Sequence, residues 1–599
     1  MSVNNESSTG VEAPQPKANA QFTLVDALPP GYAAKPAGEP DRKTITFTID
    51  GAQVNAPEGI MLVDAAKYGG VEIPVFCYEP KIGGPVGACR MCLVEIEGIP
   101  KLQTACSTPV RDGMSVITRS PRVAEAQNSV VEFLLANHPL DCPVCDKGGE
   151  CPLQDIAYGW GRGKSRFTEP KRHFEKPVAL SPSIAIDRER CILCYRCVRF
   201  SQEVSEDHQL VLLERGSQSY VGTFDGNPYI APFSGNVIEL CPVGALTSQA
   251  YRFKARPWDV EQGGSVCTLC PAQCNVSHTV RDEQVMRTLA RDNNGVDDGW
   301  ICDKGRFAHQ AWQSDQRITQ PLVRQGDKLL PARWDHALEV AAAALKKSGA
   351  KTVALAGGGS SNEEGWLLRR LMLEAVGSPH IDSRRANKPT VEIAQTLFAP
   401  SLTAAVPDLE WADAVLVLDC ELVDDMPIID LRIRKGVRRN GVKLAIASAR
   451  PSTLDGVATA SARYAPGQAG AFTQALLAAL GAPAGGELED LATRAGSSVE
   501  NIQAVAATLT DAQRVVIVWS ERLSETPHGG APLQALCNLA GHLNLSTTDG
   551  AGLFQVPIQA NGRGLREIGV LPHLGPGFAP VEPSGMSSQE MATSDQLGA

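Results

Sequence analysis

The placement of cysteine constrains this chain more than any other feature of its sequence. Fifteen of its 17 cysteines lie between Cys77 and Cys302. Together with one histidine, they divide by spacing into four sets of four potential metal ligands. The first set is Cys77, Cys89, Cys92 and Cys106; the second is His138, Cys142, Cys145 and Cys151; the third is Cys191, Cys194, Cys197 and Cys241; the fourth is Cys267, Cys270, Cys274 and Cys302. Four such sets can hold four iron–sulfur clusters, so the sequence predicts an electron-transfer path.

Size and composition exclude several classes of protein. A chain of 599 residues is too long for one core and should divide into several domains. The formal net charge of −11 favours solubility and gives no support for a nucleic-acid partner. No stretch approaches the ~20 consecutive apolar residues of a membrane-spanning helix, and the start, MSVNNESSTG, does not resemble a secretory signal. With the tight Cys-Cys spacings, this argues against disulfide bonds.

Local patterns indicate how the chain is organised. Residues 1–43 are rich in Pro, Ala, Gly and polar residues, and we expect a flexible arm there. Alternating apolar residues predict a strand over 43–50, and an apolar face predicts a helix over 122–137. The Ser/Gln/Met-rich tail from Glu582 is expected to be disordered. Four apolar runs alternate with helical segments and predict a parallel α/β sheet; they are 352–356, 414–418, 443–447 and 514–519.

The spacing of the first set is similar to that of plant-type [2Fe–2S] ferredoxins. Those proteins use a Cys-x4-Cys-x2-Cys run and a distant fourth cysteine. Here the gap from Cys77 to Cys89 is longer, but the close pair and the distant Cys106 remain. Glycines in the loop 83–89 let the backbone wrap around a cluster and direct N–H groups at sulfur. With the preceding hairpin, this predicts a β-grasp ferredoxin domain; a zinc site is the alternative.

The second set needs a ligand that is not cysteine, because three cysteines cannot complete a four-ligand cluster. His138 follows an apolar helix ending at Asn137, so we expect its imidazole at a helix end that faces the cysteines. A surface or capping histidine is the alternative at such a position. Histidine in place of a thiolate makes a site less negative and raises its reduction potential.

The third set fits half of a two-cluster ferredoxin. Bacterial ferredoxins carry two Cys-x2-Cys-x2-Cys-x3-Cys-Pro runs, and the fourth cysteine of each run binds the other cluster. The run starting at Cys191 and the pair Cys241-Pro242 supply all ligands of one cluster. The other cluster would need cysteines where the chain has Ser201, Ala231, Ser234 and Val237. We therefore predict a duplicated ferredoxin fold with one [4Fe–4S] cluster.

The fourth set alone could bind zinc or a [4Fe–4S] cluster, and its neighbours favour the cluster. Cys420 and Cys537 lie in apolar segments and are expected to be buried. Three arginines adjoin cluster cysteines and either stabilise cluster charge or form solvated or paired surface charges: Arg90, Arg196 and Arg199. Electron hopping needs no acid, base or nucleophile, so no catalytic residue is predicted.

Three motifs, in order, carry a resemblance to one family. They are Pro74-Val-Phe-Cys77-Tyr78 with Gly87-Ala-Cys89-Arg-Met-Cys92, then Cys142-Pro-Val-Cys145-Asp-Lys-Gly-Gly-Glu-Cys151-Pro-Leu-Gln154, then Arg190-Cys-Ile-Leu-Cys-Tyr-Arg-Cys-Val-Arg-Phe200. The chain resembles the bacterial form of the large iron–sulfur subunit of respiratory complex I, the proton-pumping NADH:quinone oxidoreductase. The match covers about residues 44–320, and the remainder resembles a shortened molybdopterin-oxidoreductase domain.

The patterns and the resemblance together imply a multidomain α+β and α/β fold. The expected parts are a flexible arm (1–43), a β-grasp [2Fe–2S] ferredoxin domain (44–120), a helical His-Cys [4Fe–4S] domain (121–175), a ferredoxin-like [4Fe–4S] domain with one lost cluster (176–258), a four-cysteine [4Fe–4S] domain (259–316), a molybdopterin-oxidoreductase-like α/β domain (317–581) and a disordered tail (582–599). The resemblance also supports a histidine ligand at His138.

The function implied by the resemblance is electron transfer in the peripheral arm of complex I. Electrons from NADH would enter at FMN on a partner subunit, cross one [2Fe–2S] and three [4Fe–4S] clusters here, and continue through further iron–sulfur subunits to quinone. The fourth cluster is present in only some family members and is expected to lie off the main path. No molybdopterin is expected. The chain would lie on the cytoplasmic side of the bacterial membrane and reach that membrane only through the complex.

Two other functions stay open on the sequence alone. A molybdenum formate dehydrogenase has a similar cluster domain, and the loop 357–364 could bind phosphate at a helix N-terminus. Against it, residues 381–388 include no cysteine for molybdenum, and the acidic residues in 419–425 would repel phosphate. The other function is a zinc-binding scaffold without redox activity. Zinc sites are colourless, whereas four iron–sulfur clusters would make the protein brown, with about 14 iron atoms per chain.

Overall fold

The computed structural model describes residues 36–176, 178–384, 389–524 and 530–595. Most of the expected arm, residues 1–43, therefore lies outside the described residues. The described end of this segment contains a turn and packs closely against the C-terminal domain. A Cβ at Gly38 would clash with Arg514 Nη1, so no side chain fits at that position. Within these ranges, no helix is long and apolar enough to span a membrane.

The first described domain is a mixed five-stranded sheet in the order β2-β1-β5-β3-β4. Alternating side chains of β1 are buried, with Ile45, Phe47 and Ile49 at most 2% exposed, which is why the alternating pattern forms a half-buried strand. The short helix α1 (Leu62–Ala65) also contributes to this core. The strands are β1 (Thr44–Ile49), β2 (Ala52–Pro57), β3 (Leu93–Ile96), β4 (Gln103–Thr104) and β5 (Ser115–Ile117).

The next segment is helical and matches the predicted helix within one residue. Helix α2 (Pro121–Ala136) begins after Ser120, whose side chain accepts a hydrogen bond from the Val123 N–H, and Pro121 occupies the first helical position. Helix α3 (Pro152–Trp160) contacts α2 and follows directly after Cys151. The loop between these helices therefore carries the whole second set.

The ferredoxin-like part has two short helices that each lie beside a cysteine of the third set. Helix α4 (Arg196–Glu203) contains Cys197, and α5 (Asn236–Leu240) ends directly before Cys241. Two small antiparallel sheets frame them, in the order β10-β7-β6 and as a β8-β9 hairpin. Their strands are β6 (Val178–Ala179), β7 (Ile184–Ile186), β8 (Leu210–Leu213), β9 (Tyr220–Thr223) and β10 (Leu246–Ser248).

A three-stranded antiparallel sheet completes the cluster-bearing half. Its order is β11-β12-β13, formed by β11 (Glu261–Val266), β12 (Asn275–Arg281) and β13 (Gln284–Ala290). Helices α6 (Asp303–Phe307) and α7 (His309–Trp312) pack against β13. The fourth set lies on the β11–β12 turn and at the start of α6.

The C-terminal domain contains the predicted parallel sheet, in the order β20-β19-β18-β21-β22. Every residue of β18 is buried, as expected for the central strand of a sheet covered on both faces. The strands are β18 (Ala414–Leu418), β19 (Lys443–Ser448), β20 (Ala460–Arg463), β21 (Val515–Ser520) and β22 (Gly552–Val556). The flanking helices include α13 (Pro427–Lys435), α14 (Ala469–Ala479), α15 (Leu488–Ala495), α16 (Val499–Thr510) and α17 (Gly530–His542).

The run 352–356 does not join that sheet, contrary to the sequence prediction. It contains only the two-residue strand β16 (Ala354–Leu355), which pairs in parallel with β17 (Ile381–Asp382) as a separate two-stranded sheet. Apolar residues alone could not distinguish these partners, because the run has the same composition as the central strands. Helix α9 (Asn362–Arg370) lies between these two strands in sequence, and α10 (Val391–Leu397) follows β17.

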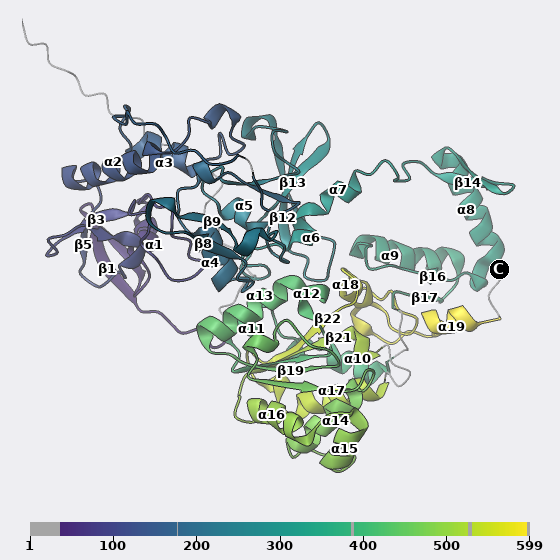
Figure 1. Cartoon of the computed structure of the whole chain (residues 1–599). Helices are drawn as coiled ribbons and strands as arrows, with labels where there is room; N and C mark the ends of the chain where they lie inside the picture. Colours follow the sequence, from purple (N-terminus) through teal and green to yellow (C-terminus); the bar gives the residue numbers. More distant parts are fainter. Residues whose placement is uncertain (1–35, 177, 385–388, 525–529, 596–599) are drawn as a thin grey trace, which may run out of the picture.

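The segment before β16 is unusually exposed. Strands β14 (Leu322–Gln325) and β15 (Lys328–Pro331) form a hairpin, and helix α8 (Trp334–Ser348) has no buried residue. Figure 1 shows β14 and α8 at the right of the view, away from the five-stranded sheet. The segment links the cluster-bearing half to the C-terminal domain.

The tail from Glu582 is partly ordered, which corrects the prediction of disorder. It contains helix α19 (Ser588–Thr593), whose capping residue Ser587 exchanges hydrogen bonds with Glu590. The Ser588 N–H also donates to Asp382 at 3.0 Å, and Met591 is buried. The polar composition of the tail predicts disorder. A capping box and one buried apolar residue are nevertheless enough to order a short helix when it lies against another part of the chain. Residues 596–599 lie outside the described part of the chain.

The two halves meet through a shared apolar cluster and through charged residues of α13 and the π-helical turn that follows it. Arg434 and Arg438 both donate to Glu206 of the cluster-bearing half, at 2.8 and 3.0 Å. Lys435 donates to Asp298 at 2.9 Å. In Figure 1, α12 (Leu422–Asp425) and α13 lie on the side of the sheet that faces the cluster-bearing half. This contact places the C-terminal domain against the fourth set.

Candidate iron–sulfur centres

The first set is brought together by the loop that follows α1 and by β3 and β4. Cys77, Cys92 and Cys106 are fully buried, and Cys89 is half-buried. The Cys106 N–H donates to Cys92 Sγ at 3.5 Å. The adjacent thiol of Cys77, together with burial, raises the pKa of Cys89 above its usual range. All four thiols are therefore close neighbours. The loop that carries Cys77 and Cys89 includes Gly83 and Gly87, which adopt positive φ angles.

The second set is more open than the first. His138 lies just beyond the end of α2 and is half-buried, Cys145 and Cys151 are buried, and Cys142 is exposed. Burial, with the positive charges of Arg190 and Lys171, lowers the pKa of His138 to about 4. Its imidazole is therefore neutral at physiological pH, which is the form that binds metal. Cys145 and Cys151 are close enough for charge on one to raise the pKa of the other.

All four cysteines of the third set line one cavity. This cavity has about 380 Å³ of space, and its other walls are mostly apolar, including Ile186, Val221 and Leu246. Burial raises the pKa of Cys191 to about 12. Burial and nearby charge on Cys241 and Cys77 raise the pKa of Cys194 to about 12. Thiolates at this position therefore require nearby positive charge, which the iron of a cluster would supply.

The positions of the missing ferredoxin cluster are filled by protein. Ser201, Ala231, Ser234 and Val237 are all buried. The Ser201 hydroxyl donates to Asp207 and accepts from the Leu210 N–H at 3.1 Å. Ser234 donates to Asp303, the residue after Cys302. Hydrogen bonds and apolar packing thus occupy the positions where a second set of thiolates would be needed.

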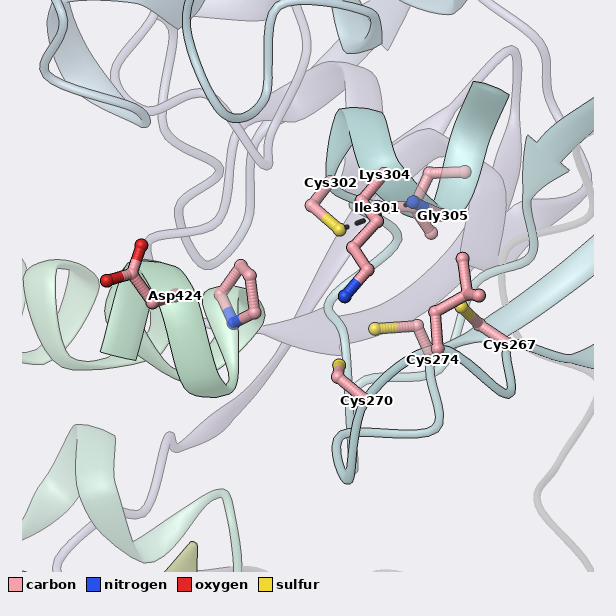
Figure 2. Close-up of a pocket in the computed structure, with 10 residues that line it drawn as sticks. Cys267, Cys270, Cys274, Ile301, Cys302, Lys304, Gly305 and Asp424 are labelled. Carbon is pink, nitrogen blue, oxygen red and sulfur yellow. Dashed lines mark hydrogen bonds between the residues drawn. The ribbon is translucent and has the colours of Figure 1, made fainter. Parts of the chain in front are cut away.

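The fourth set also lines a single cavity, shown in Figure 2. The cavity has about 350 Å³ of space, and the C-terminal domain contributes Asp424 and Pro427 to its wall. Figure 2 shows the amino group of Lys304 pointing toward the sulfur atoms. The Gly305 N–H donates to Cys302 Sγ at 3.5 Å. Burial raises the pKa of Cys270 to about 11, so this set also favours a cationic centre.

The donor sets fit clusters better than single ions. Among the residues that the structure describes, no three His, Cys, Asp or Glu side chains meet the geometry of a single metal ion. Cluster thiolates bind different iron atoms, so they surround a volume instead of a point. The third and fourth sets each place four sulfur atoms around such a volume.

The first three sets are close to one another. Arg196, which lies between two cysteines of the third set, donates to the Tyr78 carbonyl at 2.5 Å, beside Cys77. The Cys151 thiol of the second set lies 3.7 Å from the carbonyl oxygen of Pro242, the residue after Cys241. The third set therefore lies between the first and the second.

The predicted arginines differ in their surroundings. Arg90 is exposed, whereas Arg199 is buried and pairs with Glu203 at 2.8 Å. Sequence reasoning missed two cations that lie beside cluster cysteines, Arg190 and Lys304. Each of these two residues lies close in sequence to a cluster cysteine. This proximity is the one sequence signal that could have identified them as neighbours of a cluster.

The C-terminal domain does not offer a good site for a dinucleotide cofactor. In doubly wound sheets such ligands bind beyond the carboxyl ends of the strands. Here that edge holds the ion pairs Arg522–Asp425 and Arg566–Glu521. Of the acidic residues after β18, Asp424 and Asp425 form ion pairs with arginines, and Asp419 and Glu421 accept hydrogen bonds from hydroxyl groups.

The glycine-rich loop after β16 is also occupied by protein groups. The Gly358 N–H donates to the Gln559 side chain, and a Cβ at Gly358 would clash with Gln559 Cβ. Cys420 is buried and Cys537 is half-buried. The segment 381–388 is the one in which a cysteine ligand for molybdenum would be expected. Its residues 385–388 lie outside the described residues.

Family models match the chain in the order of these structural units. The matches are to the 2Fe-2S iron-sulfur cluster binding domain (42–121), the NADH-ubiquinone oxidoreductase-G iron-sulfur binding region (127–166), the NADH-quinone oxidoreductase subunit 3 ferredoxin-like domain (181–247), the Molybdopterin oxidoreductase Fe4S4 domain (264–314) and Molybdopterin oxidoreductase (317–572). This order confirms the predicted fold class and the presence of 2Fe-2S and 4Fe-4S binding domains.

Full-length comparisons agree with the family models. The G subunit of NADH-quinone oxidoreductase from Streptomyces coelicolor is 39% identical, over 94% of this chain and 66% of that protein. NADH-quinone oxidoreductase subunit 3 of Thermus thermophilus is 35% identical, over 87% of this chain and 69% of that protein. NADPH-Fe(3+) oxidoreductase subunit alpha of Geobacter sulfurreducens is 33% identical, over 89% of this chain and 66% of that protein. The chain thus spans about two thirds of the length of these curated relatives. It belongs to the family of the large iron–sulfur subunit of NADH-quinone oxidoreductase.

Proposed function

We propose that this chain is an electron-transfer subunit in the peripheral arm of NADH:quinone oxidoreductase. It receives electrons from the subunit that binds NADH and FMN and passes them to further iron–sulfur subunits on the way to quinone. The observation that carries this proposal is the convergence of four cysteines on each of two cavities. Family membership supplies the complex in which such centres operate.

The proposed centres are one [2Fe–2S] cluster and three [4Fe–4S] clusters. The first set would hold the binuclear cluster, and the second, third and fourth sets the tetranuclear clusters. Bound clusters would each take up and release single electrons. The chain fixes the positions of these centres, buries most cysteines of the third and fourth sets, and presents neutral His138 as a ligand of the second set.

The contacts between sets support an order of transfer. Electrons would move from the first set to the third and then to the second, because the third set contacts both neighbours. The second set would be the exit. Its Cys142 is exposed and lies between Leu140 and Val144, which are 88% and 60% exposed, so an apolar surface is available for the next electron carrier.

The fourth set lies beside this route in the proposal. Its cavity is closed by Asp424 and Pro427 of the C-terminal domain, which supports a structural or storage role for a cluster there. The C-terminal domain itself would act as a support, because protein side chains occupy its cofactor edge. The chain would attach to the cytoplasmic face of the bacterial membrane only through other subunits.

The test is a cysteine variant with a matched control. In the full chain, purified anaerobically, Cys241→Ala should abolish one tetranuclear EPR signal and leave the binuclear signal intact. Cys420→Ala, which removes a buried cysteine outside the four sets, should leave every signal unchanged. Loss of no signal in Cys241→Ala, or of both kinds, would refute the assignment of the third set.

The electron donor separates this function from that of the Geobacter relative, whose name specifies NADPH and Fe(3+). We expect the assembled complex to reduce quinone with NADH, and the variant Cys241→Ala to lose this activity. Reduction of Fe(3+) with NADPH, without quinone reduction, would favour the alternative.

A further inference from the structure

One buried side chain, Arg190, ties the ligand loops of the second and third sets together. It directly precedes Cys191, and it is only 6% exposed. Its Nε and Nη2 donate to Asp141 Oδ2 at 3.1 and 3.0 Å. Asp141 directly precedes Cys142. The residues that lead into the two ligand loops are therefore joined by one partly buried ion pair.

The same guanidinium group lies beside ligands of the second set. A Cβ built on Gly244 would clash with Cys145 Sγ and would lie 3.7 Å from Arg190 Cδ, so both side chains pack at one glycine of the third-set loop. Arg190 is also close enough to Cys145 and His138 for electrostatic interaction with both. Its charge thus acts on both a thiol and the imidazole of one set.

Acidic partners hold the guanidinium in this position. Asp187 Oδ2 lies 3.2 Å from Arg190 Nε, and Lys176 joins Asp141 and Glu189 at 2.6 Å each. A positive charge at a poorly solvated site stabilises the more negative, reduced form of a neighbouring cluster.

We propose that Arg190 is a positioning residue for the electron relay, which fixes the second and third sets relative to each other and raises the reduction potential of the second cluster. This inference rests on the proposed function, because it requires clusters in both sets. It goes further by assigning to one side chain a role in setting the potential of the second cluster.

The test compares charge removal on both members of the ion pair, in the anaerobically purified full chain and by EPR-monitored redox titration. Arg190→Gln should lower the midpoint potential of the second cluster, so that its oxidised-to-reduced ratio at the wild-type midpoint rises roughly tenfold. Asp141→Asn should shift the same midpoint upward. Arg190→Lys, which keeps the charge, should retain most of the wild-type potential, and the binuclear cluster of the first set should be unaffected throughout.

The outcomes distinguish this inference from its premise. If the wild-type chain lacks the second cluster, the proposed function itself fails. If the cluster is present and Arg190→Gln leaves its midpoint unchanged, only the role of Arg190 is refuted. If Arg190→Gln fails to assemble the cluster, Asp141→Asn decides: an upward shift supports the electrostatic role, and an unchanged or lower midpoint overturns it.

Discussion

The two halves of this molecule are held together by different means. The cluster-bearing half consists of small sheets and mostly short helices. Its cysteines Cys197 and Cys241 belong to a buried apolar cluster that continues into the C-terminal domain. The C-terminal domain is organised by a five-stranded parallel sheet whose central strand is fully buried. The first half should therefore depend on its metal centres for stability, whereas the second should depend mainly on apolar packing.

Removal of iron should give the largest difference between the halves. Without clusters, the walls around the third and fourth sets lose their contacts with the bound centre. We expect chelation to increase amide hydrogen exchange at least about tenfold in β7 and β10, with little change in β18 and β21. Mass spectrometry of the exchanged chain measures both regions at once. Equal loss of protection in both halves would contradict the greater dependence of the cluster-bearing half on its metal centres.

A core substitution in the C-terminal sheet should have the opposite effect. Leu416 lies in β18 and is fully buried. Leu416→Ala should destabilise this domain by about 2–5 kcal/mol, because it leaves a cavity in a packed core. Thermal unfolding should show the loss in the C-terminal transition, while the EPR signals persist at temperatures below it. Loss of the clusters under native conditions would show that the halves are not independent.

The next largest change in stability is expected at the contact between the two halves. Glu206→Gln removes the charge that accepts from Arg434 and Arg438, and we expect a cost of about 1–3 kcal/mol because the pair is mostly buried. The unfolding transitions of the two halves should then move apart. Arg450→Gln is the control, since its pair with Asp424 is exposed and should contribute less than about 1 kcal/mol.

A ligand exchange should change potential with little effect on stability. His138→Cys keeps a ligand in the second set but replaces a neutral imidazole with a thiolate. The added negative charge should lower the midpoint potential of that cluster. Redox titration followed by EPR measures the shift, and the thermal transitions of both halves should stay near the wild-type values. An unchanged potential would remove His138 from the ligand set.

Prediction from sequence succeeded where spacing or periodicity carries the information. The apolar run at 414–418 became the central strand of a parallel sheet. One cavity is lined by Cys191, Cys194 and Cys241, which their spacing had grouped, and their role as cluster ligands stays a prediction. Prediction from sequence failed where the partner of a segment decides the outcome. The run at 352–356 pairs only with β17, and the tail helix α19 depends on a distant surface.

Side-chain networks between loops were the hardest feature to predict. Nothing in the sequence around Arg190 indicates that it reaches Asp141, which is 49 positions away, because the contact depends on how two ligand loops fold together. The same holds for Ser234, at another lost ligand position, which donates to Asp303, 69 positions away. Local sequence determines which residues can bind metal, whereas tertiary structure determines which charges surround them.

The most direct test of the central claim is the iron and acid-labile sulfide content of the anaerobically purified full chain, measured with its EPR spectrum under graded reduction. We expect about 14 iron atoms per chain, with one binuclear and three tetranuclear signals. A colourless chain with zinc in place of iron, or with iron for the first set alone, would contradict the presence of four iron–sulfur clusters.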